Sequence, residues 1–75
     1  MSRKERHAAA NDRREEYAVM FLRIMLNLSV GHAQLKRDEC AKNNPQEKSL
    51  YVEGFNVALG RLNNIRTRTA ASAVA

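Results

Sequence analysis

The chain has 75 residues, a single cysteine and a net charge of +5. At this length it forms one domain at most, with a core that contributes only about 3–5 kcal/mol. The lone cysteine excludes a disulfide within the chain and predicts a reducing, intracellular setting. The sequence pI of about 10.0 favours a partner with acidic character, because opposite charges steer association.

The positive charge gathers at the two ends of the chain. Residues 1–14 hold more bases than acids, and after Glu53 the chain has no acidic residue at all. We therefore predict that these ends contact nucleic acid or an acidic protein surface, through Arg3, Lys4, Arg6, Arg13, Arg14, Arg61, Arg66 and Arg68. We expect residues 1–11 to form a flexible basic arm with no apolar signal-peptide core, and residues 68–75 to form a flexible tail.

A first helix is predicted near residues 13–42. Asp12 and Glu15 have the spacing of a capping box, and the stretch 17–30 that follows is apolar at eleven of fourteen positions. This stretch is too short to span a membrane, and Arg23 interrupts it. Gly31 costs the helix about 1 kcal/mol, yet Leu35 continues the apolar face, which favours continuation. If the helix ends at Gly31, the fold has three helices instead.

A second helix is predicted near residues 45–67, after the only proline of the chain. Asn44 suits the position that caps a helix, Pro45 suits its first turn, and Glu47 follows in the third position. Nothing in the chain alternates in the manner of a strand. The sequence therefore predicts an all-α fold, in which the two helices form an antiparallel hairpin within a single domain.

The first helix carries more apolar surface than the second can cover. Its apolar arc spans about 200°, against the roughly 100° of a helix that is covered on one side. We expect another protein or a second copy to cover the remainder, through Met20, Leu22 and Leu26. The pairs Tyr17/Phe21 and Tyr51/Phe55 are the only aromatic residues, and their spacing predicts packing between the helices. Stacking on nucleic-acid bases is the alternative.

The sequence contains no pattern that predicts catalysis or a cofactor. His7, His32 and Cys40 lack the spacing of a metal site, and His32 is expected to pack in the core or at an interface. The three glycines are isolated rather than part of a phosphate loop. Gly54 and Gly60 instead predict a close approach between helix backbones. We expect a protein that is not an enzyme and needs neither metal nor cofactor.

Two known classes resemble the chain. The segment "RKERHAAANDRRE" followed by an apolar helix, a loop and a helix resembles the layout of basic helix–loop–helix dimers, which bind DNA. The second class is the small bacteriophage-encoded regulators of host RNA polymerase, such as the transcription inhibitors and antiterminators of Xanthomonas phages. The chain resembles these in length, charge and helical character, and its most distinctive segment is "LYVEGFNVALGRLNNI".

The second resemblance implies a non-enzymatic regulator in the host cytoplasm. Its helical body would dock on an RNA polymerase subunit, and its basic ends would lie against DNA or RNA phosphates. A basic DNA-binding dimer, an inhibitor of another host protein and a purely structural homodimer remain the alternatives. Apolar burial would set the affinity, because it stabilises a complex by about 25 cal/mol per Å², whereas exposed ion pairs contribute only about 0–1 kcal/mol each.

Overall fold

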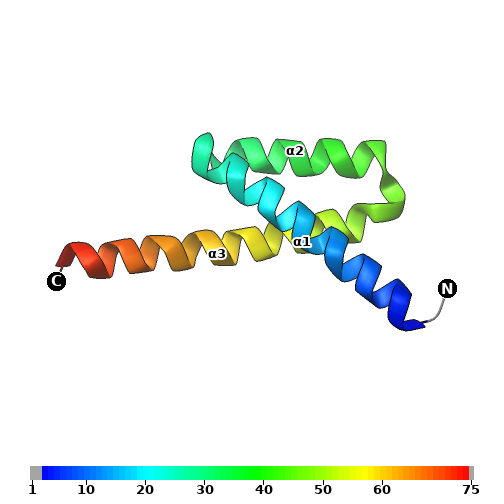
Figure 1. Cartoon of the computed structure of the whole chain (residues 1–75). Helices are drawn as coiled ribbons and strands as arrows, with labels where there is room; N and C mark the ends of the chain where they lie inside the picture. Colours follow the sequence, from blue (N-terminus) through cyan, green and yellow to red (C-terminus); the bar gives the residue numbers. More distant parts are fainter. Residues whose placement is uncertain (1–2, 75) are drawn as a thin grey trace.

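The computed structural model describes the backbone of residues 3–74 and the side chains of residues 9–69. Within that range the chain forms helix α1 (Arg3–Asn27), helix α2 (Val30–Asn43), the short 3-10 helix η1 (Pro45–Glu47) and helix α3 (Lys48–Val74), and it forms no strand. Figure 1 shows α2 running back alongside the first half of α3, with η1 at the turn between them. The predicted all-α hairpin is therefore confirmed for α2 and α3.

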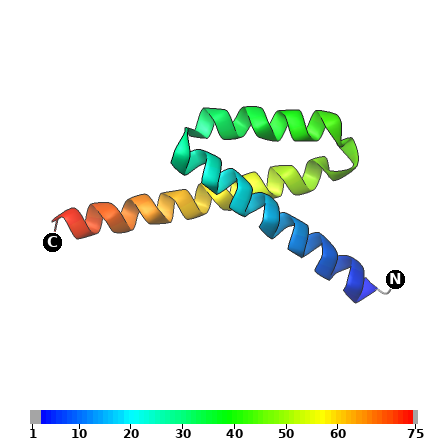
Figure 2. The ribbon, with the colours of Figure 1, turned by 45° about the horizontal axis from the view of Figure 1, so that its top comes forward.

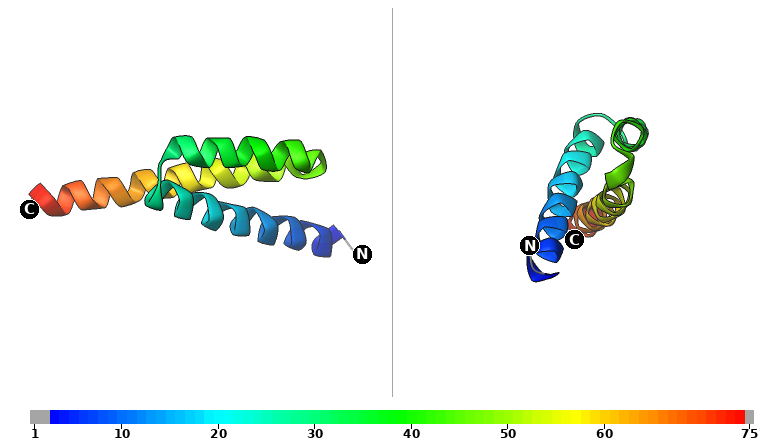
Figure 3. Two further views of the ribbon diagram at one scale, coloured as in Figure 1. Left: turned by 90° about the horizontal axis from the view of Figure 1, so that it is seen from above. Right: turned by 90° about the vertical axis from the view of Figure 1, so that its right-hand side faces the viewer.

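Helix α1 crosses this hairpin. It runs in the same general direction as α3 and crosses it near the middle of the molecule (Figures 1 and 2). Both views in Figure 3 place α1 on one side of the α2–α3 pair. The first half of α1 and the second half of α3 extend beyond the crossing, so the two ends of the chain lie at opposite ends of the molecule.

The first predicted helix is broken at Leu28 and Ser29, so its continuation through Gly31 was wrong. Ser29 has an extended backbone (φ −165°, ψ 166°), and its hydroxyl accepts a hydrogen bond from the backbone N–H of His32 at 3.1 Å. This is an N-cap, and it satisfies one of the otherwise unpaired donors at the start of α2. Gly31 lies inside the first turn of α2 rather than at a helix end. The three-helix alternative is the one observed.

The second predicted helix begins with Pro45, as expected, but its cap differs. The side chain of Asn44 makes no capping hydrogen bond, and its backbone N–H instead donates to the carbonyl of Cys40 at 2.9 Å. Asn44 therefore acts as the C-cap of α2 and does not cap the following helix with its side chain. The chain passes through the single turn of η1 before α3 begins at Lys48.

Both outer helices are longer than the sequence indicated. Helix α1 begins at Arg3 and α3 continues to Val74, so residues 3–11 of the predicted arm and residues 68–74 of the predicted tail have helical backbones. These segments are rich in alanine and arginine, which are strong helix formers, and contain no proline or glycine that would end a helix.

The core is small and lies where α1 crosses the hairpin. The buried residues are Ala18, Phe21, Met25, Ala33, Tyr51, Phe55, Ala58 and Leu62. The aromatic pairs join α1 to α3 as predicted: the ring centroids of Tyr17 and Tyr51 lie 4.3 Å apart, and those of Phe21 and Phe55 lie 5.8 Å apart, edge to face. All four aromatic residues of the chain are therefore committed to packing between helices.

One glycine sets the distance between α1 and α3. A Cβ atom on Gly54 would lie 2.8 Å from Cβ of Tyr17 and 3.2 Å from the backbone nitrogen of Ala18. The predicted close approach is confirmed at Gly54, because real Cβ atoms almost never come within 3.0 Å of such neighbours. It is wrong at Gly60, where a Cβ atom would meet nothing within 4 Å.

The fold exposes more surface than a compact chain of this mass. Its accessible area is 5597 Å², whereas a folded monomer of this size exposes about 4,700 Å². The radius of gyration is 14.4 Å, against about 11 Å for a compact domain of this length. The difference arises from the helix ends that extend beyond the crossing (Figure 1). None of the helices, over the residues described, combines the length and apolar character that a membrane span requires.

Candidate binding groove

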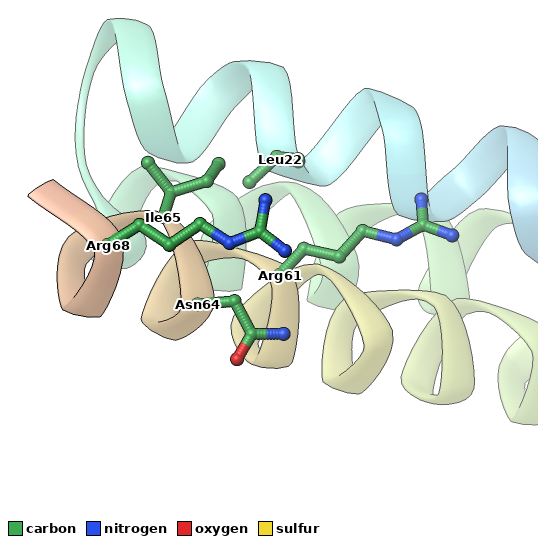
Figure 4. Close-up of a pocket in the computed structure, with 5 residues that line it drawn as sticks. All are labelled: Leu22, Arg61, Asn64, Ile65 and Arg68. Carbon is green, nitrogen blue, oxygen red and sulfur yellow. The ribbon is translucent and has the colours of Figure 1, made fainter.

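A groove lies between the second half of α1 and the second half of α3. It has a volume of about 290 Å³ and is lined by Leu22, Arg61, Asn64, Ile65 and Arg68. Figure 4 shows Leu22 approaching from α1, while the other four side chains come from successive turns of α3. Leu22 and Ile65 provide an apolar floor, and the two arginines provide a basic edge. Three residues predicted from the sequence, Leu22, Arg61 and Arg68, therefore meet in one place.

The apolar floor continues along α1 beyond the groove. Val19, Leu22 and Leu26 follow one another at spacings of three and four residues, so they share one face of the helix. We call these three residues the apolar ridge. Val19 is 46 % exposed and Leu26 is 55 % exposed, while Leu22 is half-buried and packs against the core. Together with Ile65, the ridge forms a strip of uncovered apolar surface.

The third predicted apolar residue, Met20, lies elsewhere. Two residues along an α-helix correspond to a rotation of about 200°, so Met20 lies on the opposite flank of α1 from Leu22. It is half-buried and packs against the core cluster. Met20 therefore contributes to the fold and does not extend the apolar ridge.

Arg61 is held in position by a carboxylate of α1. Its guanidinium donates a hydrogen bond to Glu15 at 2.6 Å. This hydrogen bond lowers the pKa of Glu15 and raises the pKa of Arg61, the charges adding to the effect in both cases. Both side chains are well exposed, so the pair guides the position of Arg61 more than it stabilises the fold.

Arg68 carries the uncompensated charge of the groove. It makes no ion pair with any side chain that the structure describes. In Figure 4 its side chain runs back along α3 toward Arg61. No acidic residue follows Glu53 in the sequence, so α3 itself offers no counter-charge to this end of the groove.

Two other predicted contact residues are used inside the molecule. Arg13 forms an ion pair with Glu47 at 2.7 Å, and Arg14 forms one with Glu53 at 2.7 Å. Glu47 also accepts a hydrogen bond from the hydroxyl of Tyr17. Burial of this hydroxyl and its hydrogen bond to Glu47 raise the pKa of Tyr17 above its ordinary range. These contacts fasten α1 to η1 and α3.

The remaining predicted basic residues do not join the groove. Arg66 is exposed and lies two residues from Arg68, which places it about 200° around the helix. The side chains of Arg3, Lys4 and Arg6 lie outside the described side chains. Their backbone belongs to the start of α1, at the opposite end of the molecule from the second half of α3 (Figure 1). The two basic ends therefore do not form one continuous surface.

Sequence reasoning missed Ile65, Asn64 and Val19. Ile65 follows the buried Leu62 by three residues on the same side of α3, yet it is 41 % exposed, because α1 and α3 diverge after their crossing. The three-and-four spacing of Val19 with Leu22 and Leu26 was the signal that could have found the ridge. His32 was expected in the core or at an interface; it is not in the core but exposed, with its ring nitrogen Nδ1 2.7 Å from the hydroxyl of Ser29.

No protein-family model, curated protein or solved structure matches the chain. Among the described residues, no group of three or more histidine, cysteine or acidic side chains gathers as a metal site would require. The geometry of the groove is therefore the main guide to function.

Proposed function

We propose that the chain is a small non-catalytic regulator that docks on a larger protein through the groove and the apolar ridge. The observation that carries this proposal is the uncovered apolar strip of Val19, Leu22, Leu26 and Ile65, which lies beside two arginines. Soluble monomers seldom leave such strips uncovered unless the strips serve in binding.

Bacterial RNA polymerase is the first partner to test. The sequence resembles small bacteriophage-encoded regulators of this enzyme. The chain would dock on the polymerase through the groove rather than through its basic ends. Covering about 300 Å² of apolar surface would contribute about 7.5 kcal/mol before the costs of association. The arginines orient the partner and speed its approach, since rim charges act mainly on association rates.

Leu26 offers a sharp test of this proposal. It is well exposed, so Leu26→Glu should leave the core intact, whereas Leu22 packs partly against the core and is a poorer choice. We expect Leu26→Glu to weaken binding to purified Xanthomonas RNA polymerase by at least about tenfold, or about 1.4 kcal/mol. The matched control is Leu35→Glu, which changes a leucine that is 69 % exposed on α2.

The measurement is the dissociation constant of the full chain for the polymerase, with helicity checked by circular dichroism. If Leu35→Glu weakens binding as much as Leu26→Glu, the ridge is not the docking surface. If the unchanged chain does not bind the polymerase at all, this partner is wrong.

A second candidate function is direct DNA binding through the start of α1. The observation that favours it is that the basic segment has a helical backbone from Arg3 onward and extends beyond the body of the molecule (Figure 1). A steep fall in affinity for duplex DNA with rising salt, together with a preference for sequence, would support this function. Polymerase binding in the absence of DNA binding would favour the first proposal.

A further inference from the structure

The chemistry of the groove indicates what kind of segment it receives. We propose that the groove binds an acidic amphipathic helix of the partner protein, with an apolar side chain seated between Leu22 and Ile65 and a carboxylate paired with Arg68. This inference rests on the proposed function, because it names the part of the partner that the same groove would hold.

The size of the groove favours a side chain over a free ligand. Its volume of about 290 Å³ lies at the lower limit of small-molecule pockets, which hold about 300–1,000 Å³. The apolar ridge runs along α1 next to the groove, so the apolar surface is longer than the groove itself. A helix that presents apolar residues at i, i+4 and i+7 fits such a surface.

The charge of the groove requires an acidic partner. Arg61 is already paired with Glu15, whereas Arg68 has no carboxylate partner among the side chains described. A carboxylate on the incoming helix would complete this pairing, and guanidinium and carboxylate groups match well in geometry.

The floor of the groove disfavours nucleic acid. Leu22 and Ile65 offer apolar surface, to which a phosphate backbone has nothing to contribute. Base stacking mostly uses aromatic side chains, and the four aromatic residues of the chain are used in the packing of α1 against α3. An acidic helix uses both the floor and the charge, whereas phosphate uses only the charge.

The test uses the full chain and a labelled peptide of about 18 residues, with leucines at i, i+4 and i+7 and glutamates on both sides of this stripe. Binding is followed by fluorescence anisotropy. Two control peptides share its length: in one the leucines are scrambled, and in the other lysines replace the glutamates. We expect saturable binding of the acidic striped peptide and at least about tenfold weaker binding of both controls.

Two arginines on the same helix provide matched variants of the chain. Arg68→Glu should weaken peptide binding by about tenfold, whereas Arg66→Glu should change it by less than about twofold, because Arg66 faces away from the groove. Amide chemical shifts of the unchanged chain should move at the residues that line the groove. Equal loss in both variants would indicate undirected attraction of charge and would overturn the proposal.

Other occupants give distinguishable results. If a single-stranded oligonucleotide binds more tightly than the peptide and loses affinity in Arg68→Glu, the occupant is nucleic acid and the proposal fails. If the chain sediments as a dimer that Leu26→Glu dissociates, the occupant is a second copy. If the peptide does not bind but Leu26→Glu still weakens polymerase binding, only this inference falls and the proposed function stands.

Discussion

The two interior glycines of α3 should respond in opposite ways to replacement by alanine. Gly54→Ala should lower the stability of the fold, and Gly60→Ala should raise it. At Gly54 the added methyl group would lie 2.8 Å from Cβ of Tyr17 and 3.2 Å from two backbone atoms of α1. Neither helix can move aside without disturbing the core, so overpacking should cost about 1–3 kcal/mol. At Gly60 nothing lies within 4 Å of the new methyl group.

Gly60→Ala shows the effect of helix propensity alone, whereas Gly54→Ala combines the same propensity with the steric clash against α1. Alanine favours a helix over glycine by about 1 kcal/mol at both positions, so Gly60→Ala should stabilise the chain by about 0.5–1 kcal/mol. At Gly54 the same gain offsets part of the overpacking cost, which leaves a net loss of up to about 2 kcal/mol. The difference of about 2 kcal/mol corresponds to a gap of about 8–16 °C in Tm for a domain of this size.

Thermal and urea unfolding followed by circular dichroism would measure this difference. The reasoning would be refuted if Gly54→Ala were as stable as Gly60→Ala, because α1 would then not approach α3 closely at this point. The groove depends on the same crossing, so its geometry would be in doubt as well.

Three further predictions concern the side-chain hydrogen bonds of Ser29, Tyr17 and Glu15. Ser29→Ala should destabilise the chain by about 1 kcal/mol in urea unfolding, since it removes the N-cap of α2. Because the pKa of Tyr17 is raised in the fold, its contribution to stability should be present below the ordinary tyrosine pKa of about 10 and be lost as the pH rises above it. Ultraviolet titration should show this late ionisation, and Glu47→Gln should move it to lower pH. The pKa of Glu15 is lowered by its hydrogen bond from Arg61. The Glu15–Arg61 pair should therefore be present above the ordinary carboxyl pKa of about 4.3 and be lost as the pH falls below it. An NMR titration of the Glu15 carboxyl would measure this.

Much of the fold could be predicted because its strongest signals are local. Pro45 marks the turn of the hairpin, and the two aromatic pairs at four-residue spacing identify the faces that pack together. The break at Ser29 was missed because it lies within an apolar run, where a serine cap competes with the tendency of its neighbours to continue the helix. Gly31 drew attention to the right region, but the break falls two residues earlier.

The groove could be predicted only in part. Leu22, Arg61 and Arg68 follow from an over-wide apolar face and from clustered charge, but the sequence did not indicate that they meet. Their meeting depends on the crossing of α1 over α3, which is a tertiary feature. The exposure of Ile65 has the same cause, because a residue on the core side of α3 becomes uncovered once α1 diverges.

Amide hydrogen exchange of the chain bound to its partner tests the docking surface most directly. With RNA polymerase as the partner, exchange should slow in α1 around residues 19–26 and in α3 around residues 61–68, and should be unchanged on the exposed side of α2 near Leu35. Slowed exchange confined to α2, or to the first residues of α1, would contradict the assignment of the groove and the apolar ridge as the binding surface.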